Sequence, residues 1–139
     1  MTRSKFFIAE HKAKRAGLHW DIRFKMPKSN DWASFACRKK LPDNPGEKIL
    51  AVRTHDHTEK EAIFVGTIES GYGAGTIKKW DGGSCDIIRY TPGRHISIDF
   101  KGSKLKGIYH FISTQMISKD SSGEKGESYL FFKGKIGDK

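Results

Sequence analysis

Ten short runs of β-type residues, each bounded by glycine, proline or polar turn residues, set the strongest limit on how this chain can fold. Runs of this length and spacing predict antiparallel strands in a sandwich or a closed barrel. The breaks between them include Pro42–Gly46, Gly82–Gly83 and Pro92–Gly93. The predicted strands are 5–10, 18–26, 32–37, 49–54, 61–68, 75–80, 84–90, 95–101, 107–114 and 128–133.

A chain of 139 residues is large enough to bury a core, and we expect one domain over residues 1–139. Hydrophobic residues make up 36% and aromatic residues 12%, which is too much packing material for a disordered chain. The predicted fold class is therefore mainly all-β: a compact barrel of about eight or more strands. The polar stretch 119–127 is predicted as a hairpin tip, and the glycine run 70–76 as a tight turn.

Several features bear on compartment and assembly. No apolar run approaches membrane-spanning length, and the N-terminus shows no signal-peptide pattern. Cys37 and Cys85 are far apart and form no CxxC pair, so they predict neither a zinc site nor a disulfide framework. We expect two buried thiols, a reducing cytoplasmic setting and a monomer.

The charge of the chain is high and unevenly placed. The formal net charge is +10, and residues 1–40 hold eleven Lys and Arg against three acidic residues. A basic region of this kind attracts polyanions, above all nucleic acid. The plain alternative is charge that only keeps the protein soluble. Because the charge gathers around two histidines and an aspartate, we favour a phosphate-bearing ligand.

Residues 18–25 alternate strictly between apolar and polar side chains. A period of two predicts a strand with one face in the core and the other face turned away. The core face would hold Leu18, Trp20, Ile22 and Phe24, and the other face His19, Asp21, Arg23 and Lys25. A face that is merely solvated has no need of histidine beside aspartate, so the identity of these polar residues favours a site.

Three clusters are candidates for chemistry. His11, His19 and Asp21 form a mixed nitrogen and oxygen set that suits Mn, Fe, Zn or Co, with His11 folding back across the intervening turn. The segment RTHDH places Arg53, His55 and His57 on one parity, and RKK, residues 38–40, follows an aromatic strand. Each has a bland alternative: a lone histidine is more often a hydrogen-bonded structural residue, and adjacent lysines are often solvated charge.

Six blocks taken in order resemble the 3′-phosphoesterase domain of bacterial DNA ligase D, which also has stand-alone bacterial and archaeal relatives. They are FIAEHKAKRAGLHWDIRF, SFACRKK with PGEKILAV, DH, GYGAGTIKKWDGG, HISIDFKGSKLKG and YLFFK. The most specific parts are H…LHWDIR and GYGAGT…WD. The likeness extends from Phe6 to about Lys133, and it implies a β-barrel flanked by short helices.

The resemblance implies a manganese-dependent DNA 3′-end-processing phosphoesterase. Such an enzyme removes a 3′-terminal ribonucleoside and then the 3′-phosphate, leaving a ligatable 3′-hydroxyl. Co2+ or Zn2+ are alternative ions, and the implied partners are DNA or DNA/RNA 3′ ends and a DNA ligase or end-joining machinery. By motif position, His11, His19 and Asp21 are the metal ligands, and Arg23, Lys39 and His57 contact the scissile phosphate. From the charge pattern, Lys12, Lys14 and Arg15 are expected to bind the nucleic-acid backbone.

The chain departs from the family pattern near these positions. Ala9 stands where the family often has glutamine, and Glu61 stands where a tyrosine near the phosphate is usual. Two other classes of protein remain as alternatives. A non-catalytic basic barrel that binds nucleic acid explains the charge and the aromatic residues, but not the three candidate ligands. A metal-dependent barrel acting on a small molecule explains the ligands, but not the surrounding charge.

Overall fold

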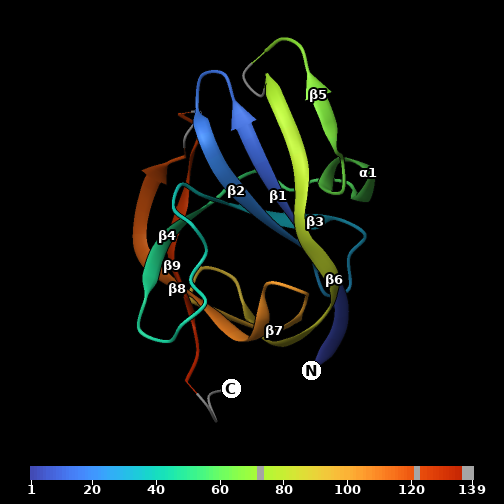
Figure 1. Ribbon diagram of the computed structural model, residues 1–139. Coiled ribbons are helices and arrows are strands. Elements are labelled where there is room, and N and C mark those ends of the chain that lie inside the picture. Colours follow the sequence, from blue (N-terminus) through green and yellow to red (C-terminus); the bar gives the residue numbers. More distant parts are fainter. Residues whose placement is uncertain (72–73, 121–122, 136–139) are drawn as a thin grey trace.

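The computed structural model describes residues 1–71, 74–120 and 123–135. Within these ranges the chain forms nine β-strands and one short helix (Figure 1). The elements are β1 Thr2–Ala13, β2 Gly17–Lys25, β3 Trp32–Cys37, β4 Lys48–Arg53, α1 Glu59–Ala62, β5 Gly66–Ile68, β6 Gly75–Thr91, β7 His95–Lys101, β8 Lys106–Lys119 and β9 Lys125–Lys133.

Eight of the strands close into an antiparallel barrel, which confirms the predicted fold class. Neighbouring strands follow the order β1-β2-β3-β4-β9-β8-β7-β6, and pairing of β1 with β6 completes the ring. The short strand β5 pairs with the start of β6 and lies outside the ring. Figure 1 shows β1, β2 and β6 running side by side, with α1 and β5 at the outer side of β6.

The main core fills the inside of the barrel with aromatic and branched aliphatic side chains. Every wall strand contributes alternate residues to it, as the period of a pleated strand requires. Phe35 and Phe111 have ring centroids 4.5 Å apart, and Phe111 and Phe131 have centroids 4.7 Å apart. Cys37 and Cys85 are both buried and free, as expected. Burial raises the pKa of both thiols, because a thiolate loses its hydration there.

A second, smaller apolar cluster lies on the outer surface of the barrel. It is formed by Phe7, Ala9, Trp32, Ala62 and Ile77, with Ile68 of β5 packed against it. Ala62 belongs to α1, so this cluster is what holds the helix and β5 against the outer face of β1 and β6. The outer face of β1 and β2 is therefore covered, and the polar residues it carries are enclosed rather than solvated.

Three predicted strands need correction. Residues 61–68 are not one strand: α1 occupies 59–62, and only Gly66–Ile68 is extended. Thr58 caps this helix and forms a capping box with Glu61, which fixes the helical turn against the β propensity of Ile63, Phe64 and Val65. The predicted strands 75–80 and 84–90 are a single strand, β6, whose pairing with β1 shifts register between Ile8 and Ala9.

The turn predictions can be checked in part. β8 and β9 pair from Lys119 and Lys125 inward, so the polar stretch 119–127 is a hairpin end, as predicted. Residues 121–122 of that stretch and 72–73 of the glycine run lie outside the described residues. In the described parts of the chain, no helix has the length and apolar character needed to cross a membrane.

Candidate metal centre

Three of the predicted site residues meet on the covered outer face of β1 and β2. His11 of β1 lies directly opposite His19 of β2 in the antiparallel register, and Asp21 follows His19 on the same face. The two imidazole rings have centroids 4.7 Å apart. Gly75 of β6 lies beside this end of β1 with a φ of +144°, and a Cβ there would overlap the carbonyl oxygen of Lys12. Glycine thus allows β6 to approach the strand that carries His11.

The three side chains fit a divalent metal ion. One ligand atom from each of His11, His19 and Asp21 lies within 4.8 Å of the other two, and all three residues are buried. Nε2 of His19 and Oδ2 of Asp21 lie 3.4 Å apart, so an imidazole nitrogen and a carboxylate oxygen already converge in this group. Two imidazoles and one carboxylate are a donor set that suits Mn, Fe, Co or Zn.

Charge within this group is arranged around Asp21. Nε2 of His19 and Nη2 of Arg23 each lie 3.4 Å from Oδ2 of Asp21. Burial disfavours the charged carboxylate, but the hydrogen bond from His19 and the neighbouring positive charges outweigh it and lower the pKa of Asp21. Burial likewise opposes protonation of His19, yet Asp21 outweighs it and raises the pKa of His19. The site therefore holds a carboxylate ready to receive a cation.

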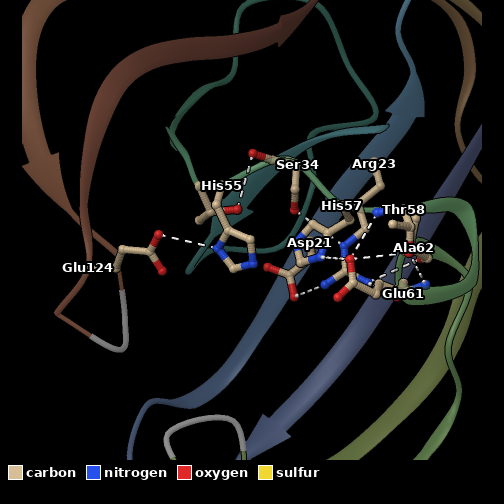
Figure 2. A network of polar contacts seen from close by, with 10 residues as sticks. Asp21, Arg23, Ser34, His55, His57, Thr58, Glu61, Ala62 and Glu124 are labelled. Carbon is tan, nitrogen blue, oxygen red and sulfur yellow. Dashed lines mark hydrogen bonds and ion pairs between the residues drawn. The ribbon is translucent and has the colours of Figure 1, made fainter. Parts of the chain in front are cut away.

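The Arg23 side chain is buried, and protein groups accept hydrogen bonds from all three of its nitrogens. Nε donates to Oγ of Ser34 at 3.3 Å, and Nη1 donates to the carbonyl oxygens of Ala62 at 3.1 Å and Glu61 at 3.4 Å. Nη2 faces Asp21, as Figure 2 shows. The guanidinium therefore joins β2, which carries two of the candidate ligands, to the carboxyl end of α1.

The segment 54–58 brings two histidines to the site. Backbone hydrogen bonds between His57 and Trp32 hold this segment against β3. The rings of His55 and His57 have centroids 4.4 Å apart, and Nδ1 of His55 lies 3.4 Å from Oε1 of Glu124 (Figure 2). Burial, Arg23 and His55 together lower the pKa of His57 to about 4. His57 is therefore a neutral imidazole at pH 7.

Glu61 is held in place by the cap of α1. Its Oε1 accepts a hydrogen bond from the backbone N–H of Thr58 at 2.9 Å and lies 3.2 Å from the Thr58 hydroxyl. These hydrogen bonds lower the pKa of Glu61. The same carboxylate lies 4.0 Å from Nδ1 of His57. The sequence signal for this arrangement is the motif T-x-x-E at residues 58–61, which the strand interpretation of 61–68 overlooked.

The three candidate ligands, Arg23, the two histidines of segment 54–58 and Glu61 line one cavity of about 570 Å3. Its wall also contains Phe64 and Ile68, which extend the apolar cover from the segment between α1 and β6. The charged and titratable lining residues are His11, His19, Asp21, Arg23, His55, His57, Lys60, Glu61, Asp120 and Glu124. Sequence reasoning missed Lys60, Asp120 and Glu124. Nothing in the sequence indicates that the hairpin end near residue 120 lies across from residue 19.

The predicted backbone-binding lysines lie outside this cavity. Lys12, at the end of β1, and Lys14 and Arg15, in the β1–β2 turn, are exposed and lie between the candidate ligands His11 and His19 in the chain. Lys39 is exposed in the connection after β3 and is not among the described residues that line the cavity. Its neighbour Arg38 donates to the carbonyl oxygen of Asp120 at 2.9 Å. The role of Lys39 as a phosphate contact stays a prediction.

The fold and the three candidate ligands define a β-barrel domain with a candidate metal centre on its outer wall. Comparison with known proteins shows the family to which this domain belongs. A family model described as the DNA ligase D 3′-phosphoesterase domain matches residues 9–113. The chain belongs to this family, as the resemblance in its motifs predicted.

Three relatives show how much of this chain, and how much of each relative, the similarity covers. The multifunctional non-homologous end joining protein LigD of Mycobacterium bovis is 36% identical over 113 residues, covering 78% of this chain and 14% of that protein. The LigD proteins of Mycolicibacterium smegmatis and Pseudomonas aeruginosa are each 34% identical over 122 residues, covering 80% and 84% of this chain. The chain covers only 14% to 16% of these relatives.

Proposed function

We propose that this protein is a divalent-metal-dependent phosphoesterase that processes DNA or DNA/RNA 3′ ends. It would remove 3′-terminal ribonucleosides, 3′-phosphates or both, and leave a 3′-hydroxyl that a ligase can join. The observation that carries the proposal is the meeting of His11, His19 and Asp21 within 4.8 Å in a cavity that also contains Arg23 and His57. Membership of the 3′-phosphoesterase family and the end-joining names of the relatives support it.

The metal-binding part of the proposal assigns His11, His19 and Asp21 as ligands and Mn2+ as the ion. The ligand set would also accept Co2+ or Zn2+. A bound divalent ion supplies Lewis acidity to a phosphoryl oxygen and lowers the pKa of a bound water. Burial of the ligands keeps this charge in a region of low dielectric constant, where it acts strongly on a phosphate.

The remaining side chains would position the phosphate. Arg23 provides a fixed positive charge beside the metal ligands, and its hydrogen bonds to Ala62 and Ser34 hold the guanidinium still. His57 enters the reaction as a neutral imidazole at pH 7, because its pKa is about 4. In that state it is suited to hydrogen-bond the phosphate rather than to protonate the departing oxygen.

The acidic lining residues make the cation necessary for this function. Asp21, Glu61, Asp120 and Glu124 line the cavity, whereas Lys60 and Arg23 are its only lysine and arginine among the described residues. A phosphate group would meet net repulsion in this cavity if no metal were bound. We therefore expect productive phosphate binding to depend on the divalent ion. Exposed cations outside the cavity, such as Lys12, Lys14 and Arg15, would attract the nucleic acid toward it.

A direct test is release of inorganic phosphate from a DNA duplex with a 3′-phosphate, with Mn2+ and with EDTA. A second duplex that ends in one ribonucleotide tests the removal of a ribonucleoside. Asp21→Asn should abolish both activities, and Asp31→Asn, an exposed aspartate in the β2–β3 turn, is the matched control that should retain them. A wild-type protein that binds duplex and Mn2+ but releases nothing would favour the non-catalytic nucleic-acid-binding barrel instead.

A further inference from the structure

A second group of metal-ligating side chains lies on the outer wall of the barrel at β7 and β8. His95 and Ser97 are on β7, and His110 of β8 lies directly opposite Ser97 in the antiparallel register. Their neighbours Ile96, Ile98 and Phe111 point into the barrel core, so these three residues point outward. None of the three lines the 570 Å3 cavity. Ser97 and His110 are nevertheless buried, and His95 is partly exposed.

The donor atoms of these residues form an equilateral triangle. Nε2 of His95 lies 2.9 Å from Nδ1 of His110, and Oγ of Ser97 lies 2.9 Å from each of these nitrogens. The imidazole centroids are 5.0 Å apart. Because the nitrogens are much closer together than the ring centres, the two rings turn these nitrogens toward each other.

Two hydrogen bonds can link the three atoms in a chain through the serine hydroxyl, but no hydrogen is then left for the third edge of the triangle. A ring nitrogen of a neutral imidazole is either a donor or an acceptor, whereas a hydroxyl can be both. If both facing nitrogens carried hydrogens, the contact between them would be repulsive. At most one N–H and the serine O–H are therefore available for three contacts. A cation would instead accept a lone pair from all three atoms at once.

We propose that His95, Ser97 and His110 form a second metal site, for a divalent ion of the Ni2+ or Cu2+ type. Imidazole nitrogens suit these ions, which favour tetragonal or octahedral geometry. For metal–ligand bonds of about 2.0–2.1 Å, the edge of an octahedral face is about 2.9 Å, whereas a tetrahedral edge is about 3.4 Å. The observed edges of 2.9 Å match the octahedral face. The partly exposed side of His95 leaves access for water ligands.

The surrounding charges affect this site in opposite ways. Burial, His110 and Arg89 lower the pKa of His95, so the imidazole is neutral at pH 7 and its lone pair is available. Arg89 of β6 lies opposite Ser97 in the register, and its charge opposes a bound cation. Removing the charge of Arg89 therefore tests whether the site binds a cation.

Paramagnetic broadening of backbone amide signals by substoichiometric Cu2+ tests the proposal, because it reports where the ion binds. In the wild type, the signals of Ser97 and His110 should broaden, and in His95→Gln this broadening should be lost. In His19→Ala it should persist, which separates this site from the ligands at β1 and β2. His55→Gln is the matched control, since His55 also lies beside a second imidazole.

Two results would overturn the second site. One is a wild-type spectrum in which the Ser97 and His110 signals stay sharp while Cu2+ broadens signals elsewhere. The other comes from Arg89→Gln, which keeps all three donors and removes the opposing charge. This variant should lower the Cu2+ dissociation constant by roughly threefold or more at low ionic strength. An unchanged or weaker Cu2+ affinity in Arg89→Gln would mean that the triangle does not hold a cation.

Discussion

Nη1 of Arg23 donates a hydrogen bond to the carbonyl oxygen of Ala62 at 3.1 Å, which ties the last residue of α1 to the strand that carries two candidate metal ligands. The same guanidinium faces Asp21 through Nη2. The helix beside the cavity and the candidate metal centre are therefore both held by one side chain. A change at Arg23 should affect both the chemistry and the position of this helix.

Arg23→Lys keeps the positive charge but loses the planar set of donors. We expect the rate of 3′-phosphate hydrolysis to fall by about two to three orders of magnitude, the usual cost of removing one such transition-state interaction. Amide exchange at Ile63, whose N–H bonds to the carbonyl of Glu59, should become faster as α1 loosens. Single-turnover kinetics and hydrogen exchange measure the two effects. A nearly wild-type rate would remove Arg23 from the proposed mechanism.

His11→Ala, His19→Ala and Asp21→Ala should each abolish turnover and greatly weaken Mn2+ binding. The barrel should stay folded, because these residues point away from its main core. Calorimetric titration with Mn2+ gives the affinity, and circular dichroism checks the fold. Unchanged Mn2+ affinity in His19→Ala would contradict the ligand assignment.

His57 should make the stability of the protein depend on pH. Its pKa is about 4 in the folded protein and 6.5 ordinarily, so the unfolded chain binds more protons between these values. The stability associated with neutral His57 is therefore present above pH 6.5 and is lost as the pH falls toward 4. Urea denaturation at several pH values should show a smaller loss for His57→Gln than for the wild type. Equal losses in the two proteins would mean that His57 is not held neutral by its surroundings.

Glu61 combines a capping role with a negative charge in the cavity, and two substitutions separate them. Glu61→Gln can keep the capping box while removing the charge, so it should speed 3′-phosphate hydrolysis, most visibly at low ionic strength. Glu61→Tyr removes the charge and the cap together, so it should lower the thermal midpoint by destabilising α1. Single-turnover rates and thermal unfolding of both variants are the measurements. A slower Glu61→Gln enzyme would indicate that the carboxylate is part of the reaction.

DNA binding should depend on salt mainly through the β1–β2 turn. Replacing Lys12, Lys14 and Arg15 together should reduce the slope of log K against log[salt] by about two to three, if each neutralises one phosphate. The matched control is a triple replacement of Lys101, Lys104 and Lys106 at the β7–β8 turn, which should change the slope less. Fluorescence anisotropy at several salt concentrations measures both. Equal changes in slope for the two triple variants would mean that DNA binding depends on the overall charge of the protein and not on the β1–β2 turn.

The local patterns of the sequence were sufficient to predict the barrel and the strand face that carries the candidate ligands. Alternation over residues 18–25 predicted that His19, Asp21 and Arg23 share a face, and the structure confirms it. It could not show that this face is covered, because the cover comes from α1 and β5. Strand periodicity also failed at residues 61–68, where the hydrogen bonds of one capping box outweigh the β propensity of the residues that follow.

The sequence also did not indicate which residues far apart in the chain lie close together in the fold. Asp120 and Glu124 line the cavity because β8 and β9 close the barrel beside β4, a relationship that no short segment encodes. The triangle at β7 and β8 was hidden for the same reason. His95 and Ser97 are visible as one strand face, but only the register of β8 brings His110 opposite Ser97.

All three candidate ligands of the first site lie on the single hairpin of β1 and β2. Their relative positions therefore do not depend on the length of the turn between these strands. The spacing between His11 and His19 is fixed by the ladder of β1 and β2, not by the residues that connect them. The turn can therefore be lengthened or rewritten while the ligand atoms stay where they are. A deletion of one residue within β1 would instead turn His11 to the opposite face of the strand. The same three side chains could therefore be introduced into the β-hairpin of another barrel, provided that its two strands pair in the same register.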